Sequence, residues 1–419
     1  MRGQDADGAR NQAPSPRPSP IEGEGEKTLQ GDALRTEPDL YPRFSEAEYR
    51  RRYQAIDGIA AGVGAAATIV YGDLGSQLDL HYVSNFMPRR DCYAVMPVNG
   101  SPTLFVQIYN HWPNSREISV IRDNRFAGVS SPETVGAHLK EIGLERATMA
   151  VVGPAPYQHM QRLKALLPQA SFVDVTRAFR VLRNVKSEEE IAWLRRAARL
   201  TDLAMEALEA EARSGMTESE WVSIAESAYV KQGGITQIHF LGSTAMRDPH
   251  LCVPTQWEAN RRIAKGDVVI TEISAFHWGY TGQIHRPIAA GEPPTPAYRR
   301  MYDAAVEAYD RIAAALKPGA TVEDLLDAAE CIHRSGYTIY DDLVHGYGGG
   351  YLEPVLRTRR TRFAPDPPFT YAKNMVVVIQ PNLITADEQM GLQVGSMLLV
   401  TETGAESLHG YPMKFIQVP

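Results

Sequence analysis

Side chains that could do chemistry are concentrated in the stretch Gly266–Pro287, which reads GDVVITEISAFHWGYTGQIHRP. Its β-branched residues, interrupted by a Gly-Tyr pair, predict two strands joined by a turn. Successive side chains of a strand point to opposite faces, so Gln283 and His285 share one face, whereas Glu272 and His277 do not. Glu272, Gln283 and His285 are candidate functional residues by type, since such groups bind polar ligands and transfer protons. The alternative for Gln283 and His285 is ordinary polarity on a half-exposed sheet, and His277 is expected to be structural.

This hairpin resembles the core hairpin of the pita-bread family, which includes creatinase, aminopeptidase P, prolidase and methionine aminopeptidase. In addition, the run RNVKSEEEIAWLRRA, which begins at Arg183, is similar to the helix that opens the catalytic domain of that family. The resemblance implies an α+β protein. A smaller creatinase-type α/β domain would come first, followed by a pita-bread domain in which helices cover a curved antiparallel sheet.

The resemblance also locates the five positions that bind two divalent cations in the metal-dependent relatives, where they are two aspartates, a histidine and two glutamates. Here they are Glu272, Gln283, His345, Gln380 and Gly395. One carboxylate in place of four would leave about three positive charges uncompensated in a buried site. We therefore predict no cofactor and no metal ligand. The alternative is a single divalent cation on Glu272, His285 and His345, since two histidines and a carboxylate can hold a transition metal.

A second histidine of the peptidases corresponds to Leu352. Because that residue and the metal ligands differ together, creatinase, which works without metal, is the more informative relative. Its proton-exchanging histidine corresponds to His250, with His239 as the competitor. We predict a metal-independent, creatinase-like hydrolase or lyase that cleaves a C–N bond of a small polar metabolite, with His345, Glu272, His285 and His250 as catalytic residues. The alternatives are an Xaa-Pro aminopeptidase or prolidase with a divergent metal site, and a catalytically inactive binding protein.

Three further residues are predicted to bind the substrate. Gln283 and Gln380 would present neutral amides, which suit an amide, ureide or carboxylate group. Creatinase places a carboxylate-binding arginine at nearly the distance from its histidine that separates Arg357 from His345. The substrate is therefore expected to be a small molecule that carries a carboxylate.

Arg89 and Arg90 stand on the connection after the YVSNF segment, and creatinase has an arginine in roughly that place. In creatinase-like enzymes, this domain of one subunit leans over the active site of the other. The resemblance thus implies a homodimer whose active sites are shared, with these arginines bound to a substrate carboxylate. The alternative is that both arginines are simply solvated.

Periodicity and turn residues divide the chain into three parts. Residues 1–40 are rich in Pro, Gly and charged residues and are predicted to form a disordered tail. Residues 41–182 are expected to form the N-terminal domain, and residues 183–419 the catalytic domain. In the former we predict helices and strands in alternation, namely helices at Glu46–Ile59, Pro132–Ile142 and Tyr157–Leu167, and strands at Thr68–Tyr71, Leu80–Val83, Cys92–Pro97, Thr103–Ile108 and Thr148–Val152. In the latter, Ser187, Thr217 and Thr321 are expected to begin three helices.

Composition excludes several classes of partner. The 419 residues carry a net charge of −7, which disfavours nucleic acid, and no apolar run approaches the roughly 20 residues that cross a membrane. No signal peptide is recognised. The three cysteines are typical of reduced thiols, so we expect a cytoplasmic protein.

Overall fold

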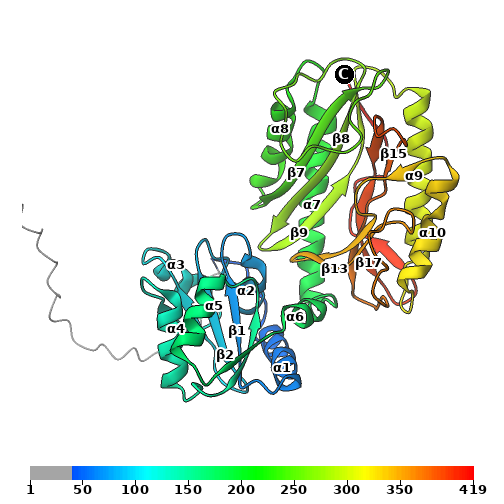
Figure 1. Cartoon of the computed structure of the whole chain (residues 1–419). Coiled ribbons are helices and arrows are strands. Elements are labelled where there is room, and N and C mark those ends of the chain that lie inside the picture. The colour runs from blue at the N-terminus through cyan, green and yellow to red at the C-terminus, as the bar shows by residue number, and fades with distance from the viewer. Residues whose placement is uncertain (1–39) are drawn as a thin grey trace, which may run out of the picture. The chain divides into compact units, whose positions relative to one another are not determined.

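The computed structural model describes residues 40–419 (Figure 1). The predicted tail, residues 1–40, lies outside the described residues except for Leu40. None of the helices between residues 40 and 419 is both long and apolar enough to span a membrane.

The first part of the chain alternates helices and strands, as predicted. Its elements are α1 (Glu46–Gly62), β1 (Ala67–Gly72), α2 (Gln77–Ser84), β2 (Cys92–Pro97), β3 (Thr103–Val106), α3 (His111–Ile118), β4 (Asp123–Phe126), α4 (Ser131–Glu141), β5 (Thr148–Val152), α5 (Tyr157–Leu166), β6 (Ser171–Asp174) and α6 (Thr176–Leu182). The strands form a six-stranded mixed sheet in the order β4-β3-β2-β1-β5-β6. Neighbouring residues of β1 belong to different cores: Val70 packs with Ile56 of α1, and Ile69 packs with Leu139 of α4. Helices therefore cover both faces of this sheet.

The prediction of a strand at Leu80–Val83 is wrong, because these residues belong to helix α2. Every residue from Asp79 to Ser84 is buried, so the apolar positions show no helical period that a sequence pattern could reveal. Asn85 ends the helix in the left-handed conformation, with φ of 64°. Because it is buried on all sides, this short apolar run resembles a buried strand in its sequence pattern.

The second part is built on a ten-stranded sheet and four long helices. Its elements are α7 (Glu188–Glu211), α8 (Glu218–Val230), β7 (Ile235–Ala245), β8 (Asp267–His277), β9 (Tyr280–His285), β10 (Ile288–Ala290), α9 (Pro296–Ala315), α10 (Val322–Arg334), β11 (Thr338–Ile339), β12 (Val344–Gly348), β13 (Gly350–Leu356), β14 (Val376–Ile379), β15 (Asn382–Ile384), β16 (Gly391–Gln393), β17 (Gly395–Val400), β18 (Ala405–Ser407) and β19 (Ile416–Val418). The main order is β13-β12-β14-β17-β9-β8-β10-β19, and its pairs are antiparallel except β10–β19. In Figure 1, α7 and α8 (green) and α9 and α10 (yellow) lie along these strands.

Local signals in the sequence correctly predict where three of these helices begin. Ser187, Thr217 and Thr321 are the N-caps of α7, α8 and α10, and each forms a capping box with the residue three positions later.

Helix α7 packs so closely on β9 that a Cβ added at Gly282 would lie 2.2 Å from the Ala197 carbonyl oxygen. Only glycine fits at that crossing. The predicted α+β organisation is thus confirmed, whereas a domain boundary near residue 183 stays a prediction.

A two-residue turn joins β8 to β9 as predicted, but it is formed by Trp278 and Gly279, and Tyr280 of the expected Gly-Tyr pair begins β9. Trp278 and Gly279 have φ of 49° and 83°, and His277 pairs with Tyr280 across the turn. The Trp278 indole N–H donates to Asn85 Oδ1 at 3.1 Å, which joins the turn to the end of α2. The first part of the chain therefore holds the tip of the hairpin in place.

Candidate active site

Polar side chains from neighbouring strands form a buried cluster on the main sheet. Glu272 comes from β8, Gln283 and His285 from β9, His345 from β12, and Gln380 directly follows β14. Glu272 is 4% exposed and the other four are fully buried. Five fully or nearly buried polar side chains among core strands are uncommon unless they bind one another or a ligand.

The amide of Gln283 orients the carboxylate of Glu272. Gln283 Nε2 donates to Glu272 Oε1 at 2.5 Å, and the reverse amide orientation would place two oxygens together. The second carboxylate oxygen faces His285 Nε2 at 3.6 Å, which is longer than a hydrogen bond. Within the described part of the chain, Gln283 Oε1 and both ring nitrogens of His285 have no hydrogen-bond partner. These three atoms are therefore available to a bound molecule.

His345 is held in a neutral state by its surroundings. Burial lowers the pKa of its imidazole to about 4. Its Nε2 lies 3.3 Å from Gln380 Oε1 and its Nδ1 lies 3.2 Å from the Gly346 carbonyl oxygen. The ring of Tyr351 stacks on it, with 3.8 Å between centroids and 16° between planes. A neutral imidazole in a dry site can accept a proton from a substrate or water.

Two adjacent carboxylates that we did not identify from the sequence lie beside this cluster. Burial, reinforced by the charge of Glu272, raises the pKa of Asp341, and burial together with Asp341 raises the pKa of Asp342. Gln393 Nε2 donates to Asp341 Oδ2 at 3.4 Å, and its own Oε1 finds no partner among residues 40–419. The Asp-Asp pair directly before the strand of His345 was the available signal in the sequence.

The structure does not join His250 to the cluster. This histidine is exposed in the connection between β7 and β8, and its Nδ1 lies 3.1 Å from Thr244 Oγ1. Its competitor His239 is buried beside the Tyr229 hydroxyl at 2.6 Å, where burial lowers its pKa. Neither residue contacts Glu272, as judged by the hydrogen bonds and ion pairs of the described residues.

The arginines predicted to bind substrate occupy different surroundings. Arg357 donates from Nη2 to the Tyr340 carbonyl oxygen at 2.6 Å and from Nε to the Thr361 carbonyl oxygen at 3.1 Å. These two nitrogens of its guanidinium group therefore already have partners. Arg89 and Arg90 are exposed between α2 and β2. No hydrogen bond or ion pair within the described chain joins these two to the cluster.

Comparison with known proteins identifies two family models along the chain. Residues 192–402 match the model of metallopeptidase family M24, and residues 52–185 match the creatinase/prolidase N-terminal domain. An uncharacterized peptidase of Staphylococcus saprophyticus is 28% identical over 344 residues, which cover 80% of this chain and 93% of that protein.

Two solved structures show the same fold. A prolidase from Pyrococcus horikoshii is 22% identical, with a TM-score of 0.74 over 87% of this chain and all of the other. An Xaa-Pro dipeptidase from Bacillus anthracis is 20% identical, with a TM-score of 0.76 over 88% of this chain and all of the other. The predicted pita-bread fold and hydrolase class are confirmed, whereas the creatinase branch is not specifically supported.

These matches overturn two predictions. The metal-independent, creatinase-like hydrolase or lyase is wrong, because the matching model is that of metallopeptidases and the relatives are peptidases and prolidases. The prediction of no cofactor is wrong for the same reason. Both predictions rested on the charge at five positions, and the carboxyl groups of Asp341 and Asp342, which interact with the charge of Glu272, lie outside them.

The five inherited positions nevertheless do not fit a two-metal centre. Gln283 directs its N–H group, a donor, at Glu272, and Gly395 has no side chain. A Cβ added at Gly395 would lie 2.6 Å from His285 Nδ1, so a carboxylate has no room there. Between residues 40 and 419, no three His, Cys, Asp or Glu side chains are grouped so that they could hold a metal ion, including Glu272, His285 and His345. No catalytic step is therefore assigned to a metal.

Proposed function

Since this chain belongs to metallopeptidase family M24, we propose that it is a peptidase that hydrolyses a short peptide with proline after the scissile bond. The observation that carries the proposal is that residues 192–402, which match the family, contain the buried polar cluster. Preference for an Xaa-Pro bond is taken from the names of the prolidase and the Xaa-Pro dipeptidase that share the fold.

Hydrolysis of an amide needs one group that takes a proton from water and one that gives a proton to the leaving nitrogen. We assign the first role to Glu272, because Gln283 fixes one of its carboxylate oxygens and leaves the other directed toward His285. Asp341 suits the second role, since burial raises its pKa and favours the protonated form. Two carboxyl groups with different surroundings can thus divide the acid and base roles.

His345 and Gln380 complete the proposed site as the groups that position the substrate. The Gln380 side chain is fixed by a donation from its Nε2 to the Asp342 carbonyl oxygen at 3.2 Å. The exposed side of Tyr351 faces a cavity of about 330 Å³, which also borders Gln77 and Gln237. We propose that substrates approach His345 by way of this cavity.

The remaining expectations also stand as proposals. We propose a cytoplasmic protein, because Cys92, Cys252 and Cys331 are all unpaired. We also propose a homodimer, because residues 52–185 match the creatinase/prolidase N-terminal domain, whose resemblance led to that expectation.

The test is a panel of dipeptides and tripeptides with proline or alanine in the second position. The purified chain is incubated without added metal and with Mn²⁺, Co²⁺ or Zn²⁺, and released amino acids are identified by mass spectrometry. Cleavage before proline supports the proposal. A folded protein that cleaves no peptide bond under any of these conditions refutes it.

A further inference from the structure

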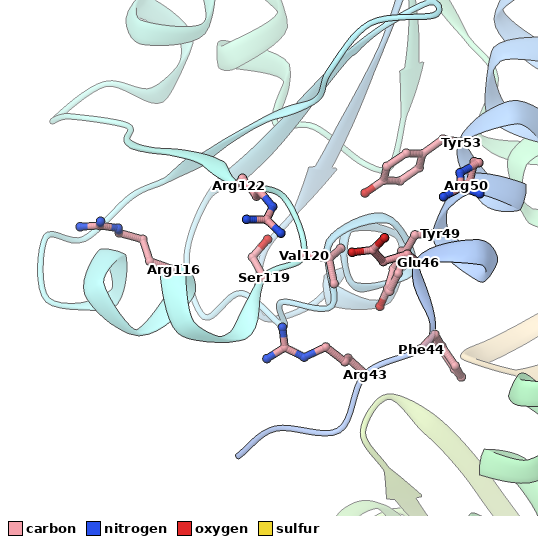
Figure 2. A pocket seen from close by; sticks show the side chains of 10 residues that line it. All are labelled: Arg43, Phe44, Glu46, Tyr49, Arg50, Tyr53, Arg116, Ser119, Val120 and Arg122. Carbon is pink, nitrogen blue, oxygen red and sulfur yellow. The ribbon is translucent and has the colours of Figure 1, made fainter. Parts of the chain in front are cut away.

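A second, strongly basic cavity lies in the N-terminal part of the chain. Its volume is about 670 Å³, and it is bordered by helix α1, by the residues just before it and by the segment after α3 (Figure 2). A volume of this size lies within the range of small-molecule sites. None of its lining residues belongs to the polar cluster around Glu272 and His345.

Four arginines line this cavity, with one carboxylate among them. They are Arg43, Arg50, Arg116 and Arg122, and the carboxylate belongs to Glu46. Arg50 and Arg122 are exposed. Within the part of the chain that the structure describes, neither forms a hydrogen bond or an ion pair. This positive charge stands out on a chain whose net charge is −7. Guanidinium groups gathered in one place attract anions.

The side chains differ in where they point. Figure 2 shows Arg122 beside Ser119, and Tyr53 and Glu46 extend from α1 toward the same side of the cavity. Arg116 points away from the other labelled residues, and its guanidinium lies 5.7 Å from the centroid of the Trp112 ring. The binding groups are therefore Arg50 and Arg122, together with Arg43, whose Nη2 also donates to the Glu117 carbonyl oxygen at 3.4 Å.

We propose that this cavity is a second ligand site, which binds a small anion of the phosphate-ester class with at least two negative charges. Guanidinium groups form paired, charge-assisted hydrogen bonds with phosphate oxygens, and several of them around one cavity favour a multiply charged group. A recessed cavity favours a small molecule over a polymer. The net negative charge of the chain also opposes nucleic acids and anionic membranes.

The experiment uses inorganic pyrophosphate as the probe and isothermal titration calorimetry at low salt. The full chain is compared with the variant Arg50→Ala/Arg122→Ala. The control, Arg146→Ala/Arg300→Ala, removes the same charge from exposed arginines elsewhere that also lack a partner in the described structure. Melting temperatures without ligand establish that all three proteins are folded. A His345→Ala variant is titrated in parallel to distinguish this cavity from the active site.

We expect one saturable site per chain. The Kd should rise about tenfold or more in the cavity variant, and it should change by less than about twofold in the control and in His345→Ala. Absence of saturable binding would overturn the proposal. Equal weakening in the control would do the same, because it would indicate non-specific attraction, and loss of binding in His345→Ala would place the anion in the active site. Tighter binding of an acidic peptide such as hexaglutamate than of pyrophosphate would show that the cavity serves a peptide instead.

Discussion

The imidazole of His285 occupies the space that a side chain at Gly395 would need. The two residues are paired across β9 and β17, and a Cβ added at Gly395 would lie 2.6 Å from His285 Nδ1 and 2.7 Å from the Ile379 carbonyl oxygen. A side chain at position 395 would therefore collide with the imidazole of His285 and with the neighbouring strand.

This contact predicts that Gly395→Ala lowers the free energy of unfolding by about 1–3 kcal/mol, the usual effect of overpacking a core. Chemical denaturation measures the change. Gly404→Ala is the matched control, because a Cβ there would meet nothing within 4 Å. Equal stability of the two variants would show that the strands beside His285 can separate at little cost.

A buried ionic network is predicted to join α1 to the catalytic sheet. Arg52 is fully buried, with its Nε 2.6 Å from Glu48 Oε1 and its Nη2 3.0 Å from the Tyr280 hydroxyl, which in turn donates to Glu190 at 2.7 Å. Arg52→Met would leave the buried carboxylates of Glu48 and Glu190 with Arg51, which is 41% exposed, as their remaining cation. We expect a loss of about 1–3 kcal/mol in the free energy of unfolding, the cost of leaving buried polar groups incompletely paired.

The matched control for this variant is Arg50→Met, on the same helix but exposed. It should change stability by no more than about 0.5 kcal/mol. If Arg52→Met were equally mild in denaturant titrations, the network would contribute nothing to holding α1 in place.

Stability is also predicted to depend on pH through buried histidines. Burial, with Arg196 nearby, lowers the pKa of His277 from 6.5 to about 4, and burial lowers that of His81 to about 3. Between pH 6.5 and 4, the unfolded chain binds protons at these rings that the folded chain does not. The free energy of unfolding should therefore fall as the pH decreases through this window, by about 1–2 kcal/mol per histidine at pH 5.

The variant His277→Gln tests this dependence, because it removes one of the rings. Urea titrations between pH 7.5 and 4.5 should give a shallower decrease for the variant than for the wild type. Parallel curves would mean that His277 is protonated equally in both states. The ring packs on Trp193 at 5.5 Å, in line with the structural role expected from the strand phase.

Shared active sites are predicted for the proposed homodimer. An Arg89→Ala/Arg90→Ala chain is mixed with a His345→Ala chain, and subunits are allowed to exchange. If the arginines act on the partner's site, about a quarter to a half of wild-type activity should return, because one site per mixed dimer regains both parts. Exchange verified by tagged pull-down without any recovery of activity would rule out a role for the arginines in the other subunit.

Much of the fold could be predicted because its signals are local. The capping boxes at Ser187, Thr217 and Thr321 satisfy backbone donors within one turn, so four residues suffice to reveal each helix start. The β8–β9 hairpin was equally visible in its β-branched run and in the Gly-Tyr pair that interrupts it. Helix α2 was not, since tertiary packing buries every side of its last two turns and erases the period.

The candidate site was predicted only in part, because its members meet through tertiary structure. Strand phase placed Gln283 and His285 on one face, and the family resemblance added Glu272 from the same hairpin. Asp341 precedes the strand of His345, but its approach to Glu272 depends on how that strand packs in the sheet, which local spacing does not encode. The wrong predictions of cofactor and function have another source, because they rested on five positions, whereas the match to the metallopeptidase model extends over residues 192–402.

The most direct test of the account is the turnover number for a peptide with proline in the second position, measured for the wild type, Glu272→Gln and His345→Ala under one fixed buffer and metal condition. The account predicts that the wild type releases the residue before proline, and that each variant lowers kcat by about 100-fold or more. Melting temperatures close to that of the wild type should show that both variants are folded. A wild-type protein that leaves the peptide intact, or variants that are folded and as active as the wild type, would contradict the proposed peptidase site.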